Sequence, residues 1–161
     1  MIDAVTIKKM WRLNQKATPK ALHLPERNFA ELAPYCDYHL LTKAASRITA
    51  FALAMSSGQA LEHVSYQWFL TRFENFVYVD RVVVDDASRR QGHGTQLLQA
   101  CIVKAQEQHK SLIVCQVHDR PSNQIAHLFV QRMGFHAIES VMLPSREIVT
   151  MYQRSIAIAT P

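Results

Sequence analysis

The sequence of 161 residues contains few cysteines and glycines and no long apolar run. No stretch approaches the roughly 18 apolar residues that a membrane-spanning helix needs. The segment after Met1 carries Asp3, Thr6 and Lys8, whereas a signal peptide would be apolar there. We therefore expect a cytoplasmic protein without a membrane partner. The three cysteines are widely spaced and form no C-x-x-C pair, which predicts reduced thiols and neither disulfides nor a zinc site.

The sequence also lacks a block of charge of one sign. Its 18 Lys and Arg residues against 13 Asp and Glu give a net charge of +5, but the cations are dispersed apart from Lys8-Lys9 and Arg89-Arg90. Dispersed cations are typical of a solvated surface, so we do not expect nucleic acid as a partner, although the charge keeps a nucleic-acid-associated protein as a distant alternative. The eight histidines form no H-x-x-x-H or H-E-x-x-H group, and we expect no metal.

No internal repeat, linker or low-complexity tract divides the chain, and we expect one domain over residues 1–161. Residues 76–85 are rich in β-branched and aromatic side chains and predict a long strand, buried on both faces near its end. A polar loop follows over 86–94, and apolar residues then recur at helical spacing over 95–109. The order is therefore strand, glycine-containing loop and helix.

The following segment repeats this order. Residues 112–118 predict a strand, and Asn123 supplies the N-cap of a helix that stops at Gly134 in left-handed conformation. The remaining predicted elements are two strand hairpins and one interrupted helical segment: 38–55, 136–154 and 7–30. Helices and strands in this order predict a mixed α/β domain around a central sheet.

Polar chemistry concentrates in residues 89–95, R-R-Q-G-H-G-T. The N–H groups at the start of a helix lack intrahelical partners, and the helix dipole favours an anion there. Gly92 and Gly94 let the backbone approach that anion, while Arg89 and Arg90 add charge and bidentate donors. The plain alternative is a tight turn without a ligand. A P-loop is excluded because the chain has no G-x-x-x-x-G-K, and a dinucleotide-binding loop because its first glycine is missing.

Two motifs resemble those of the GCN5-related N-acetyltransferases, the GNAT family. Arg89-x-x-Gly92-x-Gly94 after a Val-Val-Val strand is similar to the family's acyl-CoA signature, Q/R-x-x-G-x-G/A. Residues 123–135, N-x-x-A-x-x-F closing on M-G-F, are similar to its N-x-x-A-x-x-L/F-Y-x-x-x-G-F element. Residues 66–81, Y-x-W-F-x-x-R leading into Y-V-D-R, further resemble a bacterial subgroup of the family.

The resemblance implies the GNAT fold, an α/β (α+β mixed) fold with a central, mostly antiparallel sheet flanked by helices. It implies an N-acetyltransferase that takes an acetyl group from its co-substrate acetyl-CoA and transfers it to an amine of a small molecule, a peptide or a protein. Backbone groups of the strand would then pair with the pantetheine arm of coenzyme A, and the glycine loop would hold its pyrophosphate. The implied cofactor-binding residues are Val82, Val83, Val84, Arg89, Arg90, Gln91, Gly92, His93, Gly94, Thr95, Asn123 and Phe129.

Asp80 is the general base that the resemblance implies, because it aligns with a carboxylate that often has this role in the family. We expect it to share a strand face with Val82 and Val84. The alternative is a structural ion pair with a nearby arginine, Arg81 or Arg72.

The usual general acid of the family is a tyrosine, and this chain has Val130 at that position. Possible substitutes are Tyr66, His118, His127 and Cys115. We take Tyr66 and His118 forward as catalytic candidates, although each of the four also has a structural explanation. The departure keeps an inactive acyl-CoA-binding module as the alternative function.

The acyl acceptor is less well defined by the sequence. Tyr66, Trp68, Phe69 and Arg72 combine aromatic faces with one cation just before the cofactor strand, and they are the best candidates for an acceptor-side wall. The alternative is a helix that packs its aromatic side chains on the sheet. Exposed C-terminal strands often pair between subunits, so the sequence is also compatible with a homodimer.

Overall fold

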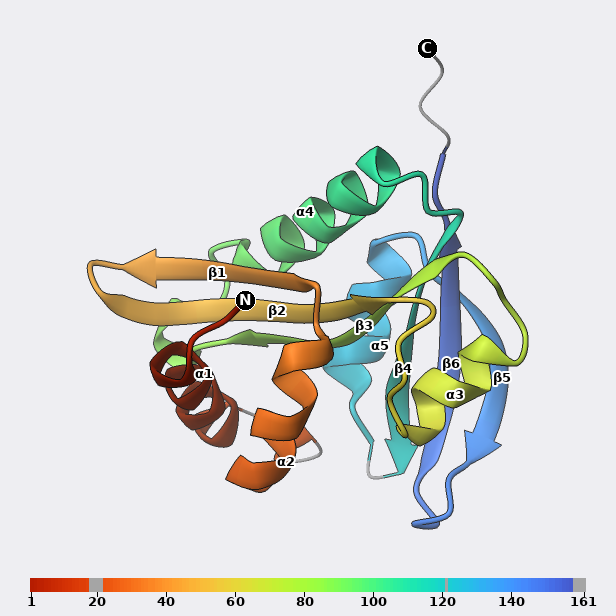
Figure 1. The fold of residues 1–161 in the computed structure, drawn as a ribbon, viewed down its shortest axis with the longest axis horizontal. Helices are drawn as coiled ribbons and strands as arrows, with labels where there is room; N and C mark the ends of the chain where they lie inside the picture. The colour runs from red at the N-terminus through yellow and green to blue at the C-terminus, as the bar shows by residue number, and fades with distance from the viewer. Residues whose placement is uncertain (18–21, 121, 158–161) are drawn as a thin grey trace.

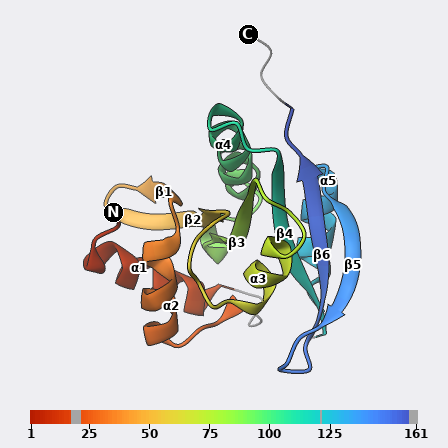
Figure 2. The same ribbon diagram turned by 45° about the vertical axis from the view of Figure 1, so that its right-hand side comes forward.

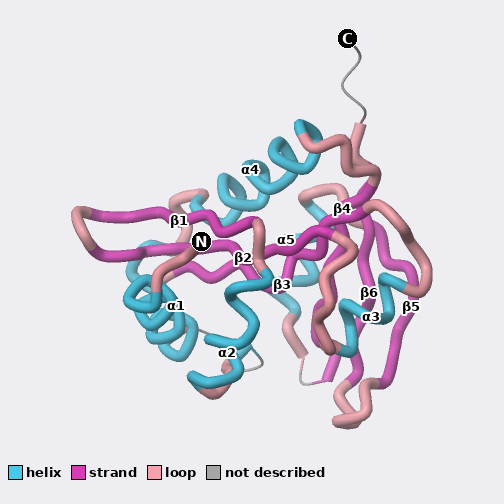
Figure 3. The backbone as a smooth tube through the Cα atoms, in the orientation of Figure 1, coloured by secondary structure: helices cyan, strands magenta, loops and turns pink. Residues whose placement is uncertain are grey.

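The computed structural model of the protein describes residues 1–17, 22–120 and 122–157. Its helices are α1 (Ala4–Lys16), α2 (Glu26–Leu32), α3 (Val64–Leu70), α4 (His93–Glu107) and α5 (Gln124–Arg132). Its strands are β1 (Tyr38–Ala44), β2 (Arg47–Ser56), β3 (Phe76–Val84), β4 (Leu112–Arg120), β5 (His136–Met142) and β6 (Ile148–Ser155). Figure 3 shows how these elements alternate along the chain.

The strands form one sheet of six in the order β1-β2-β3-β4-β6-β5. Every neighbouring pair is antiparallel except β3 and β4, which are parallel. The prediction of a mixed, mostly antiparallel sheet flanked by helices is confirmed. The parallel pair is also short, because only residues 76–78 of β3 pair with 112–114 of β4, and the two strands then diverge.

The helices cover both faces of the sheet (Figures 1 and 2). Side chains of α1, α2 and α3 pack on one face, where Met10, Phe29 and Phe69 are completely buried against residues such as Phe51. On the other face α4 and α5 contribute Cys101, Ala105 and Val130. Within the described residues no helix is long and apolar enough to cross a membrane.

Local sequence signals explain several helix ends. Asp3 caps α1 by accepting a hydrogen bond from the N–H of Thr6 at 2.9 Å, and Asn123 caps α5 in the same way from the N–H of Ala126 at 3.3 Å. After α5 the chain turns at Gly134 with φ 84°. The N–H of Phe135 then donates to the carbonyl of Val130, which closes the helix as predicted.

Two expectations differ from the structure. Helix α4 begins at His93, two residues before the predicted start at 95, because Gly92 supplies the left-handed N-cap with φ 78°. Strand β3 is buried on both faces in its first half, and buried and half-buried residues alternate in its second half. The prediction that it is buried on both faces near its end was therefore wrong. The interrupted helical segment predicted over 7–30 is confirmed, because it contains α1 and α2, and Pro25 is the N-cap of α2. Pro19 and Pro121 lie outside the described residues.

A β-bulge in β3 accounts for the most consequential difference. Leu53 of β2 pairs with Arg81 and the next residue, Ala54, pairs with Val79, so Asp80 has no partner on β2. A bulge of this kind shifts the alternation of side chains by one residue. Asp80 and Arg81 therefore both face the α1–α2 side, whereas Val82 packs on the α4–α5 side. The prediction that Asp80 shares a face with Val82 and Val84 was wrong.

Candidate active site

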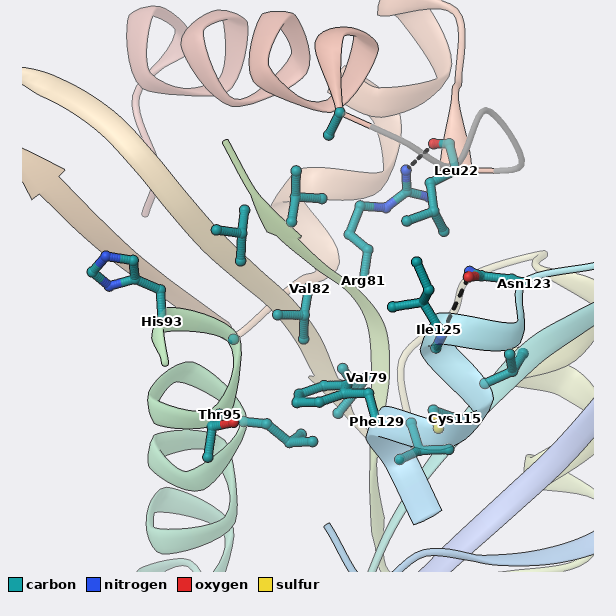
Figure 4. Close-up of a pocket in the computed structure, with 18 of the residues that line it drawn as sticks. Leu22, Val79, Arg81, Val82, His93, Thr95, Cys115, Asn123, Ile125 and Phe129 are labelled. Atoms are coloured by element: carbon teal, nitrogen blue, oxygen red, sulfur yellow. Dashed lines mark hydrogen bonds between the residues drawn. The ribbon is translucent and has the colours of Figure 1, made fainter. Parts of the chain in front are cut away.

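A cavity of about 820 Å³ opens where β3 and β4 diverge. Its two long walls are residues 79–84 of β3 and 115–118 of β4, and the loop before α4 and the start of α5 close it. Figure 4 shows Val82 of β3 and Phe129 of α5 facing each other across it. The gap exists because the parallel pairing ends at Tyr78 and Val114 while both strands continue.

The β3 wall offers backbone groups to the cavity. The N–H of Asp85 donates to Thr49 of β2 at 2.8 Å, so Asp85 points its backbone groups away from the cavity. Alternate residues of a strand point the same way, so Val83 also turns its N–H and C=O toward β2. Val82 and Val84 then turn theirs toward the opening. Of the three predicted valines, these two are placed to pair with an extended ligand.

The start of α4 forms the end wall of the cavity. Arg90 and Gly92 have φ angles of 62° and 78°, which turn the loop so that α4 begins directly at the opening. Gly92 gives α4 no side-chain cap. The N–H groups of His93, Gly94 and Thr95 therefore lack the intrahelical partners of later turns and favour an anion.

Close contact between α4 and α5 narrows this end. A Cβ atom on Gly94 would lie 3.7 Å from the ring of Phe129 and 3.7 Å from Val84. Gly94 therefore lies between two cavity walls, where an added Cβ would be in ordinary contact with both. His93 lines the cavity with its backbone, while its ring turns away from Val82 and Phe129 toward Gln91, 3.1 Å from its Oε1.

Comparison with known proteins decides what this arrangement is. A model of the acetyltransferase (GNAT) family matches residues 8–135. The chain belongs to the GNAT acetyltransferase family. It is an N-acetyltransferase by class, and the resemblance of its sequence to this family is confirmed. A search of curated proteins finds no match.

Solved structures show the same fold at low sequence identity. The ribosomal-protein-S18-alanine N-acetyltransferase of Escherichia coli is 18% identical, with a TM-score of 0.71 over 99% of this chain and 93% of that one. Ard1 of Thermoplasma volcanium is 15% identical, with a TM-score of 0.75 over 97% and 95%. Naa50 of Arabidopsis thaliana, solved with a bisubstrate analogue, is 14% identical, with a TM-score of 0.70 over 96% and 95%.

The GNAT cavity contains most of the residues that the sequence singled out. Asp80, His118, Asn123, Phe129 and the loop residues line it, but Gln91 and Tyr66 do not. Tyr66 is completely buried, and its hydroxyl donates to the Ser56 carbonyl and accepts from the Gln59 N–H, both at 2.8 Å. Burial raises the pKa of this hydroxyl. Tyr66 therefore lies outside the cavity with its hydroxyl engaged in the fold.

Helix α3 also provides no acceptor-side wall. Phe69 is completely buried against Phe76, and the Arg72 guanidinium lies 3.7 Å from the centre of the Trp68 ring. Neither these α3 side chains nor Arg72, which follows the helix, line the cavity. The structure supports the alternative that the helix packs its aromatic residues on the sheet.

Asp80 lies in a buried network at the bulge. Its Oδ2 accepts from Arg81 Nε at 2.6 Å, and the two side chains are 2% and 7% exposed. The guanidinium also donates to Asn14 Oδ1 at 3.1 Å and to the Leu22 carbonyl at 2.7 Å, the second of which Figure 4 shows. On its other side Asp80 lies 3.7 Å from His63 Nε2. The structural ion pair with Arg81, our alternative for Asp80, is present.

His118 faces the same side of the sheet from β4. Its side chain is 9% exposed, and Nε2 lies 2.6 Å from Glu147 Oε2. His127 is held differently, because its Nδ1 lies 2.8 Å from the Tyr152 hydroxyl and its Nε2 lies 2.8 Å from Asp119 Oδ1. His127 does not line the cavity, whereas His118 does.

Apolar side chains form the middle of the cavity. Val130 of α5 lines it where the family motif has tyrosine, and Cys115 of β4 lines it as well. Burial raises the pKa of the Cys115 thiol to about 12, so it remains protonated at neutral pH. Among the described residues no group of three or more His, Cys, Asp or Glu side chains could hold a metal ion.

The sequence did not reveal the tertiary partners of these groups. Glu147 comes from the β5–β6 turn, 29 residues after His118, and Leu22 comes from the α1–α2 connection. Gln116 lines the cavity, and its amide is hydrogen-bonded to the Ser65 hydroxyl of α3. Single acidic or amide residues in such positions carry no local motif.

Proposed function

We propose that this GNAT protein transfers the acetyl group of acetyl-CoA to a primary amine of a peptide, a protein or a small molecule. The observation that carries the proposal is the cavity between the diverging ends of β3 and β4, which begins at the N-terminus of α4, where no side chain caps the helix. An extended, anionic thioester fits this combination of exposed strand backbone and anion-binding helix start.

The residues fit coenzyme A in two sections. The backbone of Val82 and Val84 would pair with the pantetheine arm, and the N–H groups from Gly92 to Thr95 would hold the pyrophosphate. Arg89 and Arg90 add positive charge near that end. Phe129 and Val130 would shield the thioester from water. When bound, acetyl-CoA supplies an activated acyl group.

The amine would enter from the α1–α2 side, where Asp80, Arg81, Gln116 and His118 border the same opening. His118 is the better proton acceptor in this proposal, because Asp80 already forms a 2.6 Å ion pair with Arg81. Asp80 and Arg81 would instead shape the acceptor side and hold Leu22 at its border. Naa50, which shares the fold, was solved with an analogue that joins CoA to a peptide. A peptide amine is therefore the first acceptor to test.

The thermal midpoint of the full chain tests the cofactor half of the proposal. Acetyl-CoA and CoA at about 100 times their dissociation constant should stabilise the protein by about 2.7 kcal/mol, a shift of several degrees, while ATP should stabilise it less. Arg89→Ala and Gly92→Glu should reduce the shift. If neither acetyl-CoA nor CoA shifts the thermal midpoint, the loop is only a turn and the proposal fails.

An inactive acyl-CoA-binding module is the second candidate, and Val130 is the observation that favours it. No hydroxyl is present at this buried position to protonate a departing thiolate. A thiolate is nevertheless a tolerable leaving group near neutral pH. Release of free CoA with a panel of amines separates the two candidates, because the module would show the thermal shift and no turnover.

A further inference from the structure

A histidine–carboxylate pair borders the acceptor side of the cavity. His118 is on β4, and Glu147 belongs to the tight turn between β5 and β6. The turn is fixed by hydrogen bonds from the Leu143 N–H to the Glu147 carbonyl and from the Arg146 N–H to the Leu143 carbonyl, both at 2.8 Å. Ser145 Oγ lies 3.1 Å from Glu147 Oε1, which leaves Oε2 for His118. The carboxylate is therefore held in place from both sides.

This contact determines which nitrogen of His118 can accept a proton. Glu147 Oε2 accepts a hydrogen bond from Nε2, so the neutral imidazole carries its proton on Nε2 and a lone pair on Nδ1. Within the described part of the chain no hydrogen bond reaches Nδ1. His118 is one of the residues that line the cavity, so Nδ1, which Glu147 leaves free, is the ring nitrogen that a substrate would use.

Two charged or polar neighbours of His118 have partners of their own. From α5, His127 contacts His118 at its backbone carbonyl, at 3.1 Å, and its Nε2 also lies 2.8 Å from Asp119 Oδ1. On β3, across the opening, the Arg81 cation is paired with Asp80. Glu147 is the carboxylate in direct contact with the imidazole. A positive charge that forms on His118 is therefore stabilised by Glu147.

We propose that Glu147 is a positioning residue that holds His118 as the proton acceptor for the acyl acceptor amine. The inference rests on the proposed function. As the bond between the amine nitrogen and the acyl carbon forms, His118 Nδ1 takes one proton from that nitrogen. The carbon–sulfur bond breaks, and its electron pair leaves with sulfur as the thiolate. The imidazolium faces Glu147 until its proton passes to solvent, and the charges balance.

A purely structural contact would behave differently from a positioning contact. Glu147→Gln keeps a side chain of the same shape but removes the charge and offers an amide that can also donate to Nε2. A general base contributes about 10²- to 10⁴-fold to a rate, and losing its orientation should cost part of this. We expect kcat to fall about 10-fold or more, with the KM for acetyl-CoA unchanged. Glu147→Asp should recover part of the loss.

Glu139→Gln is the matched control. Glu139 is on β5 of the same hairpin, 56% exposed and 3.9 Å from Arg72, and it is not in the cavity lining. The same chemical change at this position should leave kcat at the wild-type value. His118→Ala completes the set, because Glu147→Gln should cause no further loss in its background if the two side chains act as one unit.

Steady-state release of free CoA from acetyl-CoA measures all six proteins: wild type, the four single variants, and the double variant of His118→Ala with Glu147→Gln. The acceptors are short peptides with a free N-terminal alanine, serine or methionine, together with lysine and spermidine. A low kcat in Glu147→Gln and in His118→Ala, without additivity, supports the proposal. A kcat equal to that of the wild type in Glu147→Gln or in His118→Ala overturns it. The proposed function still stands in that case, provided that CoA shifts the thermal midpoint and the wild type turns over. If wild type shows neither shift nor turnover, the proposed function itself fails.

Discussion

The two ends of the cavity are built from different parts of the polypeptide. At the α4 end the polar groups are backbone N–H groups, arranged by the left-handed turn at Gly92. At the acceptor end they are side chains, and two of them are held by residues far away in the sequence, Arg81 by Asn14 and His118 by Glu147. The first end depends on local conformation, and the second depends on how the sheet and helices pack.

This difference predicts that substitutions at the two ends fail in different ways. At the α4 end a side chain that blocks the turn should abolish cofactor binding at a small cost in stability. At the acceptor end the groups on β3 are part of the core, whereas His118 on β4 is paired with a half-exposed carboxylate. Substitutions on the β3 side should therefore lower the stability of the protein, and substitutions at His118 on β4 should lower its turnover.

The largest effect on stability is expected from Arg81→Met. The change leaves the Asp80 carboxylate, 2% exposed, without its cation, and it removes the donors to Asn14 and Leu22. Breaking a buried ion pair in this way should lower the free energy of unfolding by about 3–5 kcal/mol. Urea denaturation followed by circular dichroism measures the loss.

The double variant Asp80→Asn with Arg81→Met is the control for this prediction. Removing both charges avoids an unpaired buried carboxylate, so the double variant should lose less than the two single losses added together. A single loss below about 1 kcal/mol for Arg81→Met would show that the network is not part of the stability core.

The contrast between the ends also explains what the sequence could predict. The loop motif around Gly92 and Gly94 specifies its own backbone geometry, and the capping residue Asn123 does the same for α5. The side of the sheet that Asp80 faces depends on a bulge opposite Leu53 and Ala54 of β2, and no local pattern in β3 announces it. Partners that meet only through tertiary packing, such as His118 and Glu147, are beyond sequence spacing.

Tyr66→Phe should have the next largest effect, and it acts on stability alone. The hydroxyl makes two buried hydrogen bonds, to the Ser56 carbonyl and from the Gln59 N–H. Leaving these backbone groups unsatisfied should cost about 1–3 kcal/mol. We expect kcat to stay within about twofold, because Tyr66 lies outside the cavity. A severalfold drop in kcat at unchanged stability would return Tyr66 to the catalytic candidates.

Alanine substitutions at Gly92 and Gly94 should have smaller effects on stability, and these effects should differ in sign. They test the α4 end. Gly92 has φ 78°, so Gly92→Ala forces a Cβ into the left-handed region and should destabilise the protein by about 1–2 kcal/mol. Gly94 lies inside α4, and its added Cβ would meet only ordinary contacts at 3.7 Å. Gly94→Ala should be neutral or stabilising by up to about 1 kcal/mol. Equal thermal midpoints for both variants would contradict this account of the turn.

The smallest effect near neutral pH is expected for the buried thiols. Burial raises the pKa of Cys101 and of Cys115 from 9.0 to about 12 in the folded protein. A raised folded pKa contributes stability that is complete below about pH 9 and is lost as the pH rises toward 12. At pH 8 an unfolded thiol is only about 10% ionised, so these groups should change the unfolding free energy by no more than about 0.1 kcal/mol each.

The protonated, buried thiols should react slowly with a disulfide reagent at pH 8, while all three cysteines of the urea-unfolded chain should react. Rapid labelling of the native protein would show that at least one of the three thiols is not buried as the structure has it.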